Sequence, residues 1–83
     1  PNPFNPSTAL GFGLASDMPV RLAVYSVDGQ KVRELVSGQM SAGGHSVSWD
    51  GRDDAGTPVS SGVYLYRLEA GGRSEAKRML LVK

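Results

Sequence analysis

The chain has no cysteine among its 83 residues. Disulfide bonds, thiolate nucleophiles and cysteine-ligated zinc are therefore excluded. The sequence also lacks a charge excess, because 9 Lys and Arg residues balance 8 Asp and Glu residues and leave a formal net charge of +1. A balance of this kind gives no electrostatic footprint for nucleic acid or for an anionic membrane. We therefore expect neither as a partner.

Long apolar runs are missing as well. The longest is Met79 to Val82, whereas a transmembrane helix needs roughly 18 apolar residues or more. The start of the chain does not resemble a signal peptide, which would place a basic stretch before an apolar one. Because the chain begins at Pro1 without an initiator Met, we expect it to be a module of a longer protein, with no transmembrane segment of its own.

Catalytic motifs are equally sparse. His45 is the only histidine, and it stands in phase with Val47 and Trp49, which favours a structural role near the end of a strand. No serine occupies the Gly-x-Ser-x-Gly pattern of a nucleophile elbow. We therefore expect no enzymatic activity and no cofactor.

Alternation with a period of two is the strongest positive signal. Residues 45–49 place His, Val and Trp on one face and serines on the other, which predicts a strand with one buried face. Residues 63–68 begin with Val-Tyr-Leu-Tyr and have no polar alternate there, so both faces are expected to touch protein. That strand is predicted to lie at the centre of a sheet.

Turn signals separate these strands from several others. Asp28-Gly29 predicts a two-residue type I′ turn, which pairs Tyr25 with Val32 and Leu22 with Leu35. Gly71-Gly72 predicts a second tight turn, and the resulting pairs are Leu68 with Glu75, Tyr66 with Lys77, Tyr64 with Met79 and Val63 with Leu80. Residues 37–44 contain three glycines and are expected to form a loop.

The predicted fold is all-β. Short strands, separated by turns and without a helical period, indicate an antiparallel immunoglobulin/fibronectin III-like β-sandwich of about six to seven strands. Residues 1–6 contain three prolines and are expected to form an extended linker. Residues 7–83 are then a single domain. Phe4 either belongs to that linker or folds back onto the domain.

The sequence offers two alternative binding sites, one for calcium and one for a sugar. Asp50, Asp53 and Asp54 stand close together and suggest calcium, but Arg52 occupies a position where an EF-hand needs a ligand, so Asx turns are favoured and no metal is expected. Aromatic residues that could stack on a sugar are also present, but aromatic side chains in phase on strands are typical of a core. These residues are Tyr25, Trp49, Tyr64 and Tyr66.

Several segments, taken in order, resemble a known family, the type A C-terminal sorting domain of the type IX secretion system. That domain is similar to the immunoglobulin-like domain of the flagellar hook-capping protein. The resemblance implies a non-catalytic module, covalently part of a larger cargo protein. The segments are Pro1 to Thr8, Val24 to Gly29, Gly44 to Gly51, Gly62 to Tyr66 and Lys77 to Lys83.

The resemblance also implies partners and a location. An outer-membrane translocon would carry the cargo from the periplasm, and a cell-surface transpeptidase would remove the domain and attach the cargo to lipopolysaccharide. The expected location is then the cell surface or the extracellular space. Because the last strand ends the chain and its end can fray, we expect its residues to bind the secretion machinery. They are Lys77, Arg78, Leu80, Leu81, Val82 and Lys83. The alternatives are a hook-cap-like structural domain of the flagellum and a carbohydrate-binding or adhesive module of an extracellular hydrolase.

Overall fold

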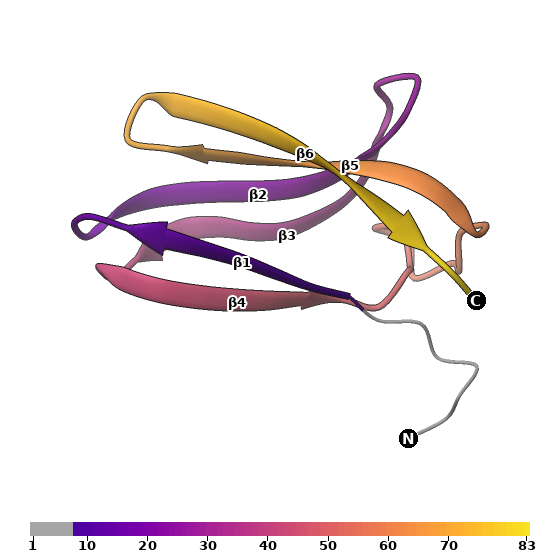
Figure 1. The fold of residues 1–83 in the computed structure, drawn as a ribbon, viewed down its shortest axis with the longest axis horizontal. Coiled ribbons are helices and arrows are strands. Elements are labelled where there is room, and N and C mark those ends of the chain that lie inside the picture. The colour runs from indigo at the N-terminus through magenta and orange to yellow at the C-terminus, as the bar shows by residue number, and fades with distance from the viewer. Residues whose placement is uncertain (1–7) are drawn as a thin grey trace.

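The computed structural model describes residues 8–83, which form six β-strands (Figure 1). The predicted linker, residues 1–6, and the expectation for Phe4 lie outside the described residues. The strands are β1 (Thr8–Leu14), β2 (Met18–Ser26), β3 (Lys31–Met40), β4 (Gly43–Trp49), β5 (Gly62–Ala70) and β6 (Arg73–Leu81).

The strands form two antiparallel sheets. One sheet pairs β1 with β4, and the other has the strand order β3-β2-β5-β6. β5 lies between β2 and β6, so its predicted central position is confirmed. In Figure 1 the β1–β4 pair lies beneath the four-stranded sheet. The all-β, antiparallel, immunoglobulin-like sandwich predicted from the alternation is therefore confirmed, with six strands in the described part of the chain.

The core lies between the two sheets and is centred on Trp49. This side chain comes from the two-stranded sheet, is 0% exposed, and packs in one cluster with Val24, Tyr64 and Leu81 of the four-stranded sheet. The rings of Trp49 and Tyr64 meet edge to face, with centroids 5.2 Å apart and planes at 70°. This is a favoured geometry for aromatic pairs. The predicted burial of Trp49 is confirmed.

The β2–β3 turn differs from the prediction. A type I′ turn needs positive φ at both central residues, but among residues 8–83 only glycines have positive φ, and here that is Gly29, at 89°. The N–H of Ser26 donates to the carbonyl of Gln30 at 2.9 Å, and the N–H of Gly29 donates to the carbonyl of Ser26 at 3.0 Å. The loop is thus residues 27–29, closed by a left-handed glycine, an arrangement typical of three-residue hairpin loops.

The longer loop and two β-bulges in the hairpin change the strand pairing. Tyr25 lies opposite Lys31, and Leu22 lies opposite Val36, so the predicted pairs are wrong by one position. The register also shifts between Leu22 and Ala23 and again between Val24 and Tyr25. Such β-bulges bend and twist a strand.

Two other segments at the opposite end of the sheet test the turn predictions. Residues 37–44 are not a loop, because Met18–Val20 at the start of β2 pair with Gly38–Met40 and extend β3. The Gly71-Gly72 turn is confirmed: both glycines have positive φ, 57° and 76°. Its register is confirmed too, with the predicted pairs Leu68–Glu75, Tyr66–Lys77, Tyr64–Met79 and Val63–Leu80 all present.

Candidate functional site

The polar loop that follows β4, residues 50–58, carries the densest hydrogen bonding in the described chain and is called the acidic loop here. Oδ1 of Asp53 accepts hydrogen bonds from the N–H groups of Ala55 at 3.0 Å and Thr57 at 2.9 Å. Oδ1 of Asp50 accepts from the N–H of Arg52 at 3.1 Å. A side-chain oxygen bonded to the backbone two residues on defines an Asx turn. The predicted turn chemistry is confirmed.

The same loop is closed by its backbone. The N–H of Asp53 donates to the carbonyl of Thr57, and the N–H of Val59 donates to the carbonyl of Gly51, each at 2.9 Å. Gly51 is buried and has φ of 76°, a conformation that favours glycine. Nη1 of Arg52 adds a bond to the carbonyl of Gly56 at 2.9 Å. The loop is therefore a small, internally bonded hairpin.

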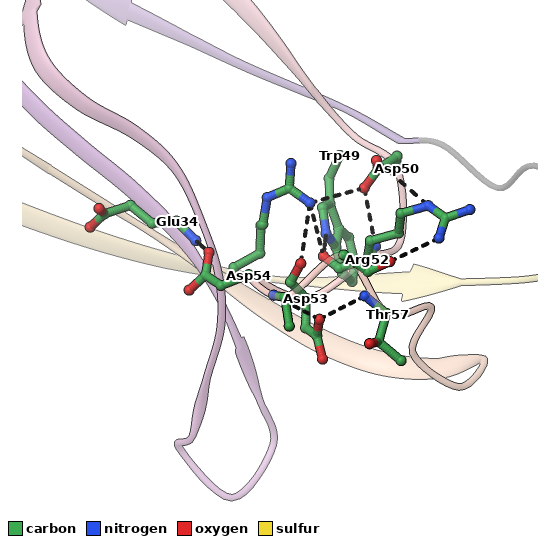
Figure 2. Close-up of polar contacts among 10 residues, drawn as sticks. Glu34, Trp49, Asp50, Arg52, Asp53, Asp54 and Thr57 are labelled. Carbon is green, nitrogen blue, oxygen red and sulfur yellow. Dashed lines mark hydrogen bonds and ion pairs between the residues drawn. The ribbon is translucent and has the colours of Figure 1, made fainter.

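Asp54 connects this loop to the free edge of β3. Its N–H donates to the carbonyl of Val32 at 2.9 Å. Its Oδ1 accepts from the N–H of Glu34, also at 2.9 Å (Figure 2). β3 is an edge strand, and an unpaired edge exposes backbone donors and acceptors to other chains. Asp54 satisfies one acceptor and one donor of that edge. The acidic loop thus covers part of it.

Arg33 of β3 and Trp49 at the end of β4 also bind the loop. Figure 2 shows Trp49 beside Arg52. The carbonyl of Arg52 accepts from Nε1 of Trp49 at 2.9 Å and from Nη1 of Arg33 at 3.3 Å. Nη1 of Arg33 also lies 3.4 Å from Oδ1 of Asp50 and from the carbonyl of Asp53. Sequence reasoning missed Arg33, because its partners lie 17 to 20 residues away and no local pattern connects them.

This arrangement is suited to rigidity rather than to cation binding. The Asp53 and Asp54 oxygens described above receive backbone N–H groups, whereas calcium needs several free carboxylate and carbonyl oxygens converging on one point. Among residues 8–83 no group of three or more His, Asp or Glu side chains is placed to hold a metal ion.

His45 is held by structural contacts. Its ring stacks on Phe12 of β1, with centroids 5.5 Å apart. Its Nε2 lies 2.7 Å from the carbonyl of Ser41. A carbonyl only accepts hydrogen bonds, so Nε2 carries the proton and donates it. These contacts agree with the predicted role near a strand end.

Two of the four aromatic side chains considered for sugar binding are buried. Trp49 is 0% exposed and Tyr64 is 9% exposed, and the hydroxyl of Tyr64 donates to the carbonyl of Ser60 at 2.7 Å. Neither ring offers a face to a pyranose. Tyr25 and Tyr66 are partly exposed and lie on opposite faces of the four-stranded sheet, so they do not form one stacking platform.

The residues predicted to bind a partner lie on β6 and just after it. Leu81 is 3% exposed and belongs to the core cluster, so it is not available at the surface. The N–H of Lys83 donates to Oγ of Ser61 at 3.0 Å. This bond joins Lys83 to the residue just before β5. The other predicted residues, Lys77, Arg78, Leu80 and Val82, are exposed. None of the described residues forms a helix long and apolar enough to cross a membrane.

Comparison with known proteins identifies relatives of this domain. Two curated relatives, the basal-body rod modification protein FlgD of Salmonella typhimurium and that of Salmonella typhi, are each 38% identical over 62 residues. The match covers 71% of this chain and 27% of each relative, so the chain spans about a quarter of their length. The crystal structure of FlgD from P. aeruginosa superposes with a TM-score of 0.72 at 24% identity. That superposition covers 92% of this chain and 60% of the other, and it supports the fold.

These findings correct the functional interpretation of the sequence. The predicted type IX sorting function is wrong, and so are its partners, the translocon and the transpeptidase, and the predicted route from the periplasm to the cell surface. Short segments of this kind accompany a sandwich fold that serves many different functions, so they do not specify one. The profile of the FlgD Ig-like domain matches residues 2–74. The chain belongs to the FlgD Ig-like domain family.

Proposed function

We propose that this chain is a non-catalytic structural domain of a FlgD-type protein and acts in assembly of the flagellar basal body, at the rod or hook. The observation that carries the proposal is the family match over residues 2–74, together with 38% identity to the two Salmonella rod modification proteins. Because the match spans 27% of those relatives, the role proposed is that of one domain within a longer protein. Its location is then the flagellar basal body.

The geometry supports a mechanical role. The acidic loop is fixed to the edge of β3 through Asp54 and to the core through Trp49, so both sheets and the longest connection form one rigid unit. His45, the only histidine of the chain, makes a structural bond to the carbonyl of Ser41, and Asp53 accepts the N–H of Thr57 within its own loop. We further propose that residues 7–83 are one domain, since the core cluster takes side chains from both sheets.

Domain exchange tests this function. In Salmonella typhimurium, the segment of FlgD that matches this chain is replaced by residues 1–83 and expressed in a strain that lacks its own FlgD. We expect the chimera to restore swimming in soft agar, because a structural domain with the same fold and surface should support the same assembly. A chimera carrying Trp49→Ala is the matched control, and it should fail because its core is disrupted.

Protein levels decide how the outcome is interpreted. The chimera should accumulate to the level of native FlgD on an immunoblot. If it accumulates and resists proteolysis but the cells remain non-motile, the proposed function is contradicted. Rescue by the Trp49→Ala chimera at an equal level would contradict the claim that the folded sandwich is what acts.

A further inference from the structure

One end of the outer face of the four-stranded sheet is apolar. The outer face is the one turned away from β1 and β4, and it carries the residues that alternate with the core side chains Val24, Tyr64 and Leu81. Strand pairing places Leu80 beside Val63, and Leu65 beside Tyr25, on this face. These neighbours form a surface that we call the outer patch, consisting of Tyr25, Val63, Leu65 and Leu80.

The exposed apolar side chains of the molecule gather at this end. The large hydrophobic side chains that are exposed among residues 8–83 are Val27 at 69%, Val63 at 41%, Leu80 at 64% and Val82 at 67%. Val82 follows Leu80 by two positions, and Val27 follows the end of β2, whose last residue pairs with Tyr64. In Figure 1 the β2–β3 turn, the start of β5 and the end of β6 lie at the same end of the sandwich. Clustered exposed hydrophobic side chains mark interaction sites more often than isolated ones do.

Further along β5 the outer face carries charged residues, Arg67 and Glu69, which makes the patch distinct. Arg67 lies opposite Ala23 and Ala76, and Glu69 lies opposite Arg21. A sheet with one solvated face normally alternates polar and apolar residues along its whole length. Here residues 63–66 at the start of β5 break that alternation. That unbroken apolar start predicts protein on both faces, but no described residue covers the outer one at Val63, which is 41% exposed.

Two basic residues lie beside the patch, and one of them, Lys31, is already paired with Glu34 and with Asp54, the latter at 3.9 Å. Arg78 lies opposite Leu65, and Lys31 lies opposite Tyr25. The nearby acid Glu34 is already engaged by Arg21 at 2.9 Å and by Lys31 at 3.5 Å. Within the described part of the chain Arg78 forms no ion pair. A cation beside an apolar surface favours a partner that brings a carboxylate to it.

We propose that the outer patch is a docking surface for a polypeptide segment that carries aliphatic side chains next to a carboxylate. The aliphatic groups cover Val63, Leu65 and Leu80, and the carboxylate pairs with Arg78. A second copy of this chain fits poorly, because patches meeting face to face would bring their Arg78 and Lys31 side chains together. The inference goes beyond the proposed function and holds whether or not the domain acts in flagellar assembly.

Peptide selection tests the surface directly. Random peptides displayed on phage are selected on the 83-residue chain, after depletion on its Leu80→Ser variant. The enriched peptides should combine aliphatic residues with Asp or Glu. A synthetic peptide of the enriched sequence should bind Leu80→Ser and Arg78→Glu about tenfold or more weakly than wild type, a loss that marks a central contact. Arg73→Glu makes the same charge change on the same strand outside the patch, and it should bind like wild type.

Each outcome decides for or against the docking surface. The three substituted side chains, Arg73, Arg78 and Leu80, are exposed. The variants should therefore keep the fluorescence of buried Trp49, which confirms that they fold. Failure to enrich any sequence overturns the proposal, as does enrichment of peptides without acidic residues. Equal loss of binding in Arg73→Glu also overturns it. A dimer in sedimentation that disappears in Leu80→Ser would assign the surface to a second copy and overturn the acidic partner.

Discussion

At the scale of single residues, Trp49 joins parts of the molecule that are far apart in sequence. Its ring fills the space between the sheets against Tyr64, and its Nε1 donates to the carbonyl of Arg52 in the acidic loop. A buried tryptophan normally finds a partner for this N–H. The position of the loop is therefore tied to the packing of the core. The sequence predicted the burial of Trp49, but it did not predict this bond.

Substitutions of Trp49 should separate the contributions of its packing and of its Nε1 hydrogen bond to the free energy of unfolding. Trp49→Ala should lower the free energy of unfolding by about 3–5 kcal/mol, the range for removing a large core side chain. Trp49→Phe keeps an aromatic ring but leaves the Arg52 carbonyl without this donor, and we expect a smaller loss, about 1–3 kcal/mol. Urea unfolding followed by circular dichroism measures both. Val27→Ala, at a side chain 69% exposed, is the control. A loss from Trp49→Ala no larger than that of the control would refute the role of Trp49.

Asp28 offers a prediction about pH. A hydrogen bond from the hydroxyl of Ser26 stabilises the carboxylate and lowers the pKa of Asp28. A group whose pKa is lower in the folded state adds stability above its unfolded pKa, and this contribution disappears as the pH falls through the folded pKa. Ser26→Ala should raise the pKa of Asp28 in a carbon-detected NMR titration. An unchanged pKa in that variant would show that Ser26 is not the cause. Because Asp28 is exposed, the effect on global stability should be small.

At the scale of elements, the two hairpins show what could be predicted from sequence and why the rest could not. Gly71 and Gly72 both tolerate positive φ, so the tight turn and every pair derived from it are confirmed. In the other hairpin only Gly29 has positive φ, while Asp28 keeps an ordinary conformation and accepts a bond from Ser26. The existence of a turn follows from local sequence. Its length depends on such side-chain bonds and on the bulges of β2, which the alternation does not reveal.

Gly29 should be sensitive to substitution for a conformational reason. Its φ is 89°, and no other atom lies within 4 Å of the place that a Cβ would occupy. Gly29→Ala should therefore cost about 1–2 kcal/mol through backbone strain rather than a clash. Gly13→Ala is the matched control, since its site is equally open and its φ is not positive. It should change stability by no more than about 0.5 kcal/mol. Equal effects of the two substitutions in urea unfolding would show that strain is not the reason.

The contact between the acidic loop and β3 can be measured at one amide. Asp54→Ala removes the acceptor of the Glu34 N–H, so the exchange of that amide with solvent should become faster in hydrogen-exchange NMR. Asp17→Ala is the control, because Asp17 accepts the N–H of Ala42 at 2.8 Å in a different loop. It should speed the exchange of Ala42 and leave Glu34 unchanged. Unaltered exchange of Glu34 in Asp54→Ala would mean that the loop does not cover this edge.

At the scale of the whole molecule, the fold could be predicted from the sequence but the function could not. The period of two and the turn residues predicted the sandwich, because alternation records which side chains meet in the core. The type IX function was inferred instead from the resemblance of several short segments to a known family, and it was wrong, since such a sandwich serves many functions. The covering of the β3 edge by Asp54 and the clamp made by Arg33 join residues 17 to 22 positions apart. Contacts of that kind become visible only after the sheets are assembled.

The central claim is that this chain acts as a folded FlgD-type domain in assembly of the flagellar basal body. The most direct measurement is an electron-microscopy count of hooks per cell in the Salmonella strain that carries the chimeric FlgD. The account predicts counts close to those of cells with native FlgD, and none when the chimera carries Trp49→Ala. Cells that accumulate the stable chimera yet lack hooks would contradict it.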